Sequence, residues 1–137
     1  RLTPFRGHHA AQARAVSALA VPLDRAVRNV RVLSRRLSVA TDRSEVVPEE
    51  LLVLVDELAG ATLHLAEDLG TERPLDDAVD ALAAVGLASG LVPRSSLSAD
   101  VVLAQVRSAT VDLLMVAGLD DAAAHDRVPP RPGEHFG

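Results

Sequence analysis

Apolar residues recur along the chain at alternating steps of three and four, the pattern of helices that bury one side. The clearest case spans residues 15–40. Its apolar positions are Val16, Leu19, Leu23, Ala26, Val30, Leu33, Leu37 and Ala40. The register continues across Pro22, which predicts a single helix, about 8–41, kinked near that proline. Two helices meeting at Val21 are the alternative. A continuous helix would be roughly 50 Å long, so one end is expected to project.

Three further helices follow from the same pattern, over about 48–69, 74–89 and 98–117. The buried side of the helix at 48–69 is predicted to contain Leu51, Val55, Leu58, Thr62, Leu65 and Leu69. Gly60 lies inside it and indicates a close approach of another helix. The next helix has Leu75, Val79, Leu82 and Val85 on its buried side, and the last has Val102, Val106, Ala109, Leu113 and Val116. Ser95, Ser96 or Ser98 can cap the last helix, and Gly118 with Leu119 can end it.

These elements predict an all-α fold, a four-helix up-down bundle with a long, Pro-kinked first helix. The bundle domain would span residues 8–119. Residues 1–7 contain Pro4 and Gly7 and are expected to form an irregular leader. Residues 120–137 lose the helical period and end in a Pro-rich stretch, so they are expected to form a flexible tail.

Composition narrows the chemistry of the core. The chain has 137 residues, which fits one domain, and only 1% of them are aromatic. Leu, Val and Ala must therefore build the interior. Since there is no cysteine, neither a disulfide nor a thiolate metal site can form. The chain begins at Arg1 without a methionine, and we expect it to be a piece of a longer protein.

Charge is unevenly distributed. The first 43 residues hold nine arginines against Asp24 and Asp42, whereas residues 44–137 hold five arginines against seventeen acidic residues. The simplest interpretation is a basic first helix beside acidic helices of the same bundle. The alternative is contact between the basic helix and an anionic membrane surface. Aromatic side chains for base stacking are missing and the whole chain is acidic, so we predict no nucleic-acid partner.

Few residues of the sequence are candidates for binding a metal ion. His64, Glu67 and Asp68 are predicted on one exposed side of the second helix, with Glu57 two turns earlier, and a His and a carboxylate at this spacing can bind a divalent metal. An ordinary solvated face is the stronger interpretation, because bundle metal sites draw inward-pointing ligands from several helices. We therefore predict no metal site and no cofactor. The adjacent His8 and His9 are expected at the surface, and His125 and His135 in the tail.

The last helix has Gln105, Ser108 and Asp112 on one face, with Arg107 beside them. This face could bind across the bundle or to a partner, but a solvated face is the preferred interpretation. An ion pair between Asp112 and arginines of the first helix is also expected, contributing at most about 1 kcal/mol if exposed. No Gly-rich phosphate loop and no nucleophile with a paired base is present, so we predict no catalytic residues and no enzymatic activity.

The segment Pro22–Arg36, PLDRAVRNVRVLSRR, resembles a helix of the fusaric-acid-resistance-like family of actinobacterial membrane proteins, also described as aromatic acid exporters. Residues 97–114, LSADVVLAQVRSATVDLL, and the stop at Gly118 and Leu119 are similar to a later segment of that family. The resemblance covers most of residues 15–119. It rests on packing patterns and carries no substrate-binding residues over.

The resemblance implies a cytosolic domain of an integral membrane efflux protein, with an assembly or regulatory role and no transport activity alone. Its expected partner is the protein's own transmembrane part upstream, and homo-oligomer formation and contact with an anionic membrane surface are further expectations. The location would be the cytoplasmic face of the cell membrane, with this piece itself soluble. The arginines of the first 43 residues agree with that placement. A scaffolding or partner-binding bundle unrelated to transport is the alternative function.

Overall fold

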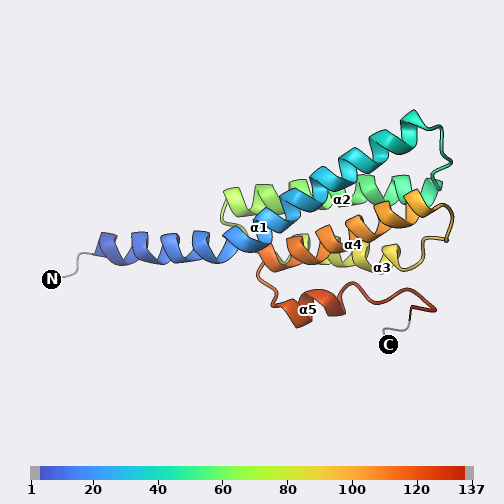
Figure 1. The fold of residues 1–137 in the computed structure, drawn as a ribbon. Helices are drawn as coiled ribbons and strands as arrows, with labels where there is room; N and C mark the ends of the chain where they lie inside the picture. The colour runs from blue at the N-terminus through green and yellow to red at the C-terminus, as the bar shows by residue number, and fades with distance from the viewer. Residues whose placement is uncertain (1–3, 135–137) are drawn as a thin grey trace.

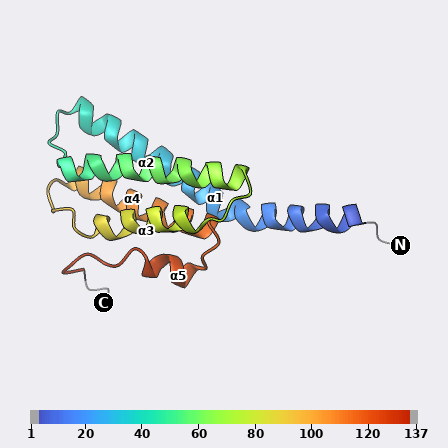
Figure 2. The same ribbon diagram turned by 180° about the vertical axis from the view of Figure 1, so that it is seen from behind.

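The computed structural model describes the backbone of residues 4–134 and the side chains of residues 21–134, apart from Val27 and Thr41. Within these residues the chain forms helices and no strand, which confirms the predicted all-α class. The helices are α1 (Pro4–Asp42), α2 (Glu49–Gly70), α3 (Asp76–Ser89), α4 (Leu97–Val116) and α5 (Asp121–Asp126). The four longer helices alternate in direction and pack as a helical bundle (Figures 1 and 2).

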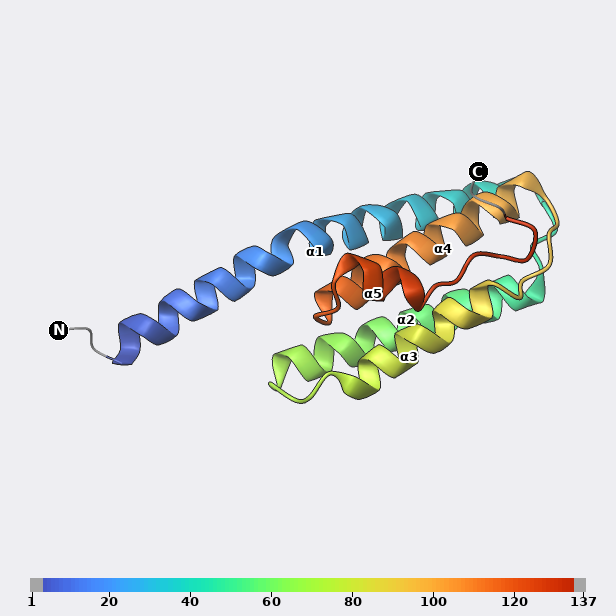
Figure 3. The same cartoon turned by 90° about the horizontal axis from the view of Figure 1, so that it is seen from below.

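Helix α4 is the centre of the bundle and closely approaches each of the other four helices. Helices α1 and α4 form one layer, while α2 and α3 form the other (Figure 3). Among the helices of residues 4–134, α1 lies close to α4 only, and the backbones of α1 and α2 are not in close contact. One side of the bundle is therefore wider than the others.

The core consists of aliphatic residues, as the composition required. Leu54 of α2, Leu82 of α3, and Leu103 and Leu114 of α4 are almost completely buried. Burying each leucine side chain contributes about 2 kcal/mol, so the apolar periodicity of the sequence is what drives these helices together. The ends of α4 also agree with the sequence.

Ser96 caps the start of α4 by accepting a hydrogen bond from the Ala99 N–H at 3.1 Å. At its end, Gly118 adopts a positive φ of 106°. The Leu119 N–H donates to the Leu114 carbonyl at 3.1 Å and the Gly118 N–H to the Met115 carbonyl at 3.0 Å. These two bonds form the predicted Schellman cap.

The buried sides of α1 and α2 differ from the prediction by about one position. Pro22 and Ala26 are buried in α1, whereas Leu23 and Val30, predicted to be inside, are largely exposed. In α2 the buried row is Leu51, Leu54, Leu58, Ala61, Leu65 and Asp68, instead of the row through Val55, Thr62 and Leu69. Asn29 and Asp68 lie on the packed sides of these helices because each has a polar partner, Asp112 and His64 respectively. A search for apolar residues alone cannot detect such positions.

The predicted irregular leader is wrong for the residues that the structure describes there, because α1 begins at Pro4. Proline suits the first position of a helix, and Gly7 costs only about 1 kcal/mol in its interior. Residues 1–3 lie outside the described part. The helix also continues through Pro22, which excludes two helices meeting at Val21.

The expectation of a flexible tail is also wrong over residues 120–134. Asp120 caps the short helix α5 by accepting from the Ala123 N–H at 2.8 Å. Ala124, Val128 and Arg131 are buried beyond it. Sequence period alone missed this segment because it is fixed mainly by hydrogen bonds between arginines and backbone carbonyls.

The N-terminal part of α1 projects beyond the other helices, as all three views show (Figures 1–3). The helix has 39 residues, which corresponds to about 60 Å. No helix in the described part of the chain combines the length and the apolar character needed to cross a membrane.

Candidate functional site: the C-terminal groove

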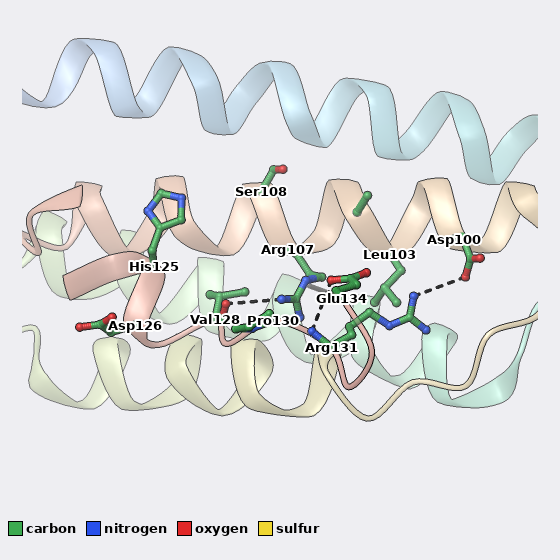
Figure 4. Close-up of a pocket in the computed structure, with 11 residues that line it drawn as sticks. Asp100, Leu103, Arg107, Ser108, His125, Asp126, Val128, Pro130, Arg131 and Glu134 are labelled. Carbon is green, nitrogen blue, oxygen red and sulfur yellow. Dashed lines mark hydrogen bonds and ion pairs between the residues drawn. The ribbon is translucent and has the colours of Figure 1, made fainter. Parts of the chain in front are cut away.

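A hollow lies between α4, α5 and the C-terminal segment, defined here as residues 127–134 (Figure 4). Its volume is about 610 Å³. We call it the C-terminal groove. Leu103, Ala104, Val128 and Pro130 provide its apolar surface, and two arginines, Arg107 and Arg131, provide its positive charge.

Arg107 joins three parts of the chain. One terminal nitrogen, Nη1, donates to the Ser89 hydroxyl of α3 at 2.7 Å. The other, Nη2, donates to the carbonyl oxygens of Val128 and Pro129 in the C-terminal segment. Ser89 in turn donates to the Gly86 carbonyl at 2.6 Å. The guanidinium group therefore ties the C-terminal segment to both α3 and α4.

Burial is the main influence on the pKa of Arg107 and lowers it from the ordinary value. The nearby carboxylate of Glu134 acts in the opposite direction, and the positive charge of Arg131 lowers the pKa further. An arginine retains its proton despite such a shift, so Arg107 remains a cation in the groove.

Arg131 is the second anchor, with only 8% of its surface exposed. Its Nη2 donates to the Val92 carbonyl at 2.8 Å, and its Nη1 lies 3.6 Å from Oδ1 of Asp100. Its backbone N–H donates to Oε2 of Glu134 at 3.3 Å. The segment thus reaches the loop between α3 and α4 as well as the first turn of α4.

Gly86 allows the C-terminal segment to lie directly on α3. A Cβ atom at this position would overlap the Arg127 carbonyl oxygen and a methyl group of Val128. Gly60, where the sequence predicted a close helix approach, has open space in place of a Cβ. The predicted close approach at Gly60 is therefore wrong. The glycine that another segment approaches closely is Gly86, and that segment is the C-terminal one.

The two arginines of the groove fix the C-terminal segment that forms one of its walls. Carbonyl oxygens of an irregular segment need donors when they are buried, and Arg107 and Arg131 supply them. At the opposite end of the groove, Nδ1 of His125 lies 2.8 Å from the Asp121 carbonyl and 3.5 Å from Oδ1 of the same residue, so it interacts with its own helix. The prediction that the chain is not an enzyme stays a prediction.

The four predicted metal candidates do not converge in one place. Nε2 of His64 lies 3.2 Å from Oδ2 of Asp68, but Asp68 is buried, contrary to the predicted exposed side, while Glu57 and Glu67 are exposed. Among the described residues, no group of three or more His, Asp or Glu side chains is arranged to hold a metal ion.

Asp112 of α4 is buried against α1, where Oδ2 accepts a hydrogen bond from Nδ2 of Asn29 at 2.6 Å. Burial raises the pKa of Asp112, while Arg25, the bond from Asn29 and the charge of His125 act to lower it. The expected arginine partner is therefore replaced by Asn29, with Arg25 acting by its charge. Gln105 is half-buried, and its Oε1 is buried without a hydrogen-bond partner in the described structure. Ser108 is exposed and lines the groove.

Other predicted candidates lie elsewhere. The arginines of α1 at positions 25, 28, 31, 35 and 36 are exposed, as expected of a basic helix face. The side chains of His8 and His9, and the whole of His135, lie outside the described residues. Sequence reasoning missed Arg131 and the docking role of Arg107. Two features of the sequence could have indicated the docked segment: Gly86 inside a helical pattern, and the prolines at positions 129 and 130.

Comparisons with known proteins give one informative match. No protein-family model matches the chain, and no solved structure matches it significantly. An uncharacterized protein of Corynebacterium glutamicum is 30% identical over 131 residues, which cover 90% of this chain. The same alignment covers 34% of that protein. The chain therefore spans about a third of the length of the curated relative that it matches.

Proposed function

We propose that the chain is a cytosolic helical-bundle domain of an integral membrane efflux or transport protein. In this proposal, α1 connects the bundle to a transmembrane part upstream. The domain serves assembly or regulation and does not transport by itself. The observation that carries the proposal is the projecting part of α1, which continues the bundle helix without a break at Pro22.

A rigid connector is the use that best fits such an extension. Most of the stability of a helix in a protein comes from packing, so a helix whose backbone projects beyond the bundle is suited to contact a neighbour. Its arginines at 6 and 14, and those on the exposed face further along α1, are typical of a segment next to a membrane on the cytoplasmic side. Each arginine near an anionic surface contributes about 1 kcal/mol of attraction.

The length of the relative supports a place within a longer protein, because the matched region is a third of that protein. The resemblance of residues 22–36 and 97–114 to the fusaric-acid-resistance-like family supports membership in that family and hence the efflux class. Family membership and class remain part of the proposal.

The proposal includes a finer description of the fold. We infer that α1–α4 act as one four-helix up-down bundle and that α1 bends at Pro22. The alternating directions of the four helices support the first part. The second part is supported by Pro22 lying buried within α1 near the place where the helix leaves the bundle, since proline removes one helix hydrogen bond.

Fusion reporters on the native gene product test the proposal. Green fluorescent protein and alkaline phosphatase are each fused to Gly137 in the host, and the cells are separated into membrane and soluble fractions. We expect the fusions in the membrane fraction, with fluorescence and without phosphatase activity, because the bundle and the reporter that follows it would lie in the cytosol. A reporter in the soluble fraction, or a gene without apolar segments of about 20 residues upstream of Arg1, would contradict the proposal.

A further inference from the structure

The arginines between residues 21 and 43 are exposed on the outside of the bundle. They are Arg25, Arg28, Arg31, Arg35, Arg36 and Arg43. Arg28 lies 3.3 Å from Asp24, one turn away, and both side chains of this pair are largely exposed. Among the described side chains, none of the six arginines forms an ion pair with an acidic residue of another helix. The acidic helices of the bundle therefore do not pair with the basic side of α1.

Most acidic residues of the helices lie in the other layer. Helix α2 contains six acidic residues and α3 contains three, and neither helix has a lysine or an arginine. Because α1 lies close to α4 only, this negative charge is one layer behind α1 (Figure 3). Packed helices are about 8–10 Å apart, which is about one Debye length at physiological salt. The outer side of α1 therefore presents positive charge, although the whole chain has a net charge of −5.

A line of valines runs between these arginines. With about 100° between successive helical residues, Val21, Val32 and Val39 fall on one line along α1. Val21 is 59% and Val39 is 36% exposed, and Val32 is half-buried. The same spacing places arginines on both sides of the line, with Arg25 and Arg36 on one side and Arg28, Arg31 and Arg35 on the other. We call these three valines and five arginines the basic α1 face.

This pattern fits a lipid surface better than a folded partner. Asp24 and Asp42 are exposed on α1 as well, and six arginines against these two aspartates leave a net charge of +4 over residues 21–43. A rigid partner would need a charge of the right sign opposite each residue, whereas mobile anionic lipids respond to the net charge. Arginines beside an apolar strip are typical of helices that lie in a membrane interface. Residues 21–43 contain no aromatic side chain on which a nucleic acid base could stack.

We propose that the basic α1 face binds an anionic phospholipid surface, with α1 parallel to the membrane and the acidic α2–α3 layer turned away from it. In this orientation the arginines lie next to the lipid phosphates, and the nine acidic residues of α2 and α3 are separated from them by the α1–α4 layer. The inference names a partner for the domain, and it rests on the proposed function for the membrane that the domain meets.

Cosedimentation with vesicles tests the contact, using the chain of residues 1–137. We expect binding to vesicles that contain phosphatidylglycerol and no binding to vesicles of phosphatidylcholine alone, and added salt should release the chain. The double variant Arg31→Gln, Arg35→Gln should raise Kd by at least about tenfold, because it removes two charges from the basic α1 face.

The matched control is the double variant Arg73→Gln, Arg94→Gln. It removes the same number of charges from exposed arginines in the two loops that flank α3, and it should leave Kd nearly unchanged. Circular dichroism melting shows whether each variant remains folded, which is expected at exposed positions. A wild-type chain that does not bind the anionic vesicles, or equal weakening by the two double variants, would overturn the proposal.

Tryptophan fluorescence tests the orientation. The chain has no tryptophan or tyrosine, so Val21→Trp and Leu87→Trp each introduce a single reporter. The two positions are similarly exposed, at 59% and 61%, but Val21 lies on the basic α1 face and Leu87 on α3. Anionic vesicles should shift the emission of Val21→Trp to shorter wavelength and leave that of Leu87→Trp unchanged. A shift at Leu87→Trp, or at neither position, would contradict the orientation.

Two further outcomes separate this inference from its competitors. Binding of a short DNA duplex under conditions in which the anionic vesicles are not bound would overturn the lipid contact in favour of a nucleic acid. Absence of vesicle binding, with the reporter fusions in the membrane fraction, would refute the contact and leave the proposed function intact. Vesicle binding with the fusions in the soluble fraction would support the contact and contradict the proposed function.

Discussion

Two edges of this bundle differ: one is closed by a segment of the chain, and the other leaves apolar side chains exposed. At the edge beside α3 and α4, the C-terminal segment is held in place by Arg107 and Arg131, whose guanidinium groups bind backbone carbonyl oxygens. At the edge between α1 and α2, Leu23, Leu52 and Leu63 remain exposed. Hydrogen bonds within the chain hold the segment at the first edge, whereas no residue between 21 and 134 covers the leucines at the second. Substitutions at the first edge should therefore lower the free energy of unfolding, whereas substitutions at the exposed leucines of the second edge should change it little.

Gly86→Ala should give the largest loss at the closed edge. The added methyl group would overlap the Arg127 carbonyl, so we expect a cost of about 2 kcal/mol despite the better helix propensity of alanine. Chemical denaturation measures it. Gly60→Ala is the control and should instead stabilise the chain by up to about 1 kcal/mol, because open space surrounds that position. Equal effects of the two substitutions would argue against docking of the segment on α3.

Arg107→Ala should have the next largest effect. It removes the donor to Ser89 and to two carbonyls of the C-terminal segment, which should cost about 1–2 kcal/mol. Faster hydrogen exchange at residues 127–134 should accompany the loss. Arg94→Ala, at an exposed arginine in the same region, should change neither quantity measurably. Unchanged exchange in Arg107→Ala would show that the segment does not depend on this anchor.

Asp112→Asn tests the interface between α1 and α4 through its pH dependence. Since burial raises the pKa of Asp112, ionisation of this group opposes folding at neutral pH, and the variant should then melt at a higher temperature than the wild type. As the pH falls through the raised pKa toward the ordinary aspartate value, the folded wild type takes up the proton more readily than the unfolded chain. The difference in Tm between Asp112→Asn and the wild type should therefore become smaller as the pH falls. A gap that widens on acidification would contradict this sign.

Leu63→Ser should have the smallest effect on the isolated subunit. Because 62% of Leu63 is exposed, its loss should change the free energy of unfolding of the monomer by no more than about 0.5 kcal/mol. Denaturation at a concentration low enough to keep the chain monomeric measures this. A loss as large as that of Gly86→Ala would mean that Leu63 is covered by another part of the chain.

Apolar periodicity was sufficient to predict the all-α class and the approximate extent of α2, α3 and α4, because burial of leucine and valine on one side of each helix dominates their energetics. Local chemistry was sufficient for the caps at Ser96 and Gly118, since these depend on neighbouring residues only. The exact buried rows of α1 and α2 were not predictable in this way. Asn29 and Asp68 lie inside because of polar partners, and for Asn29 that partner, Asp112, is 83 positions away in the sequence.

The sequence by itself therefore determined which segments become helices and where most of them end, because propensity, capping and burial act over a few residues. Tertiary structure alone decided that residues 127–134 are held in place, that Gly86 is a point of close approach, and that α1 and α2 leave an apolar edge uncovered. These features depend on distances between segments that are far apart in the chain. Hydrogen bonds from Arg107 and Arg131 to distant carbonyls leave no periodic signal in the sequence.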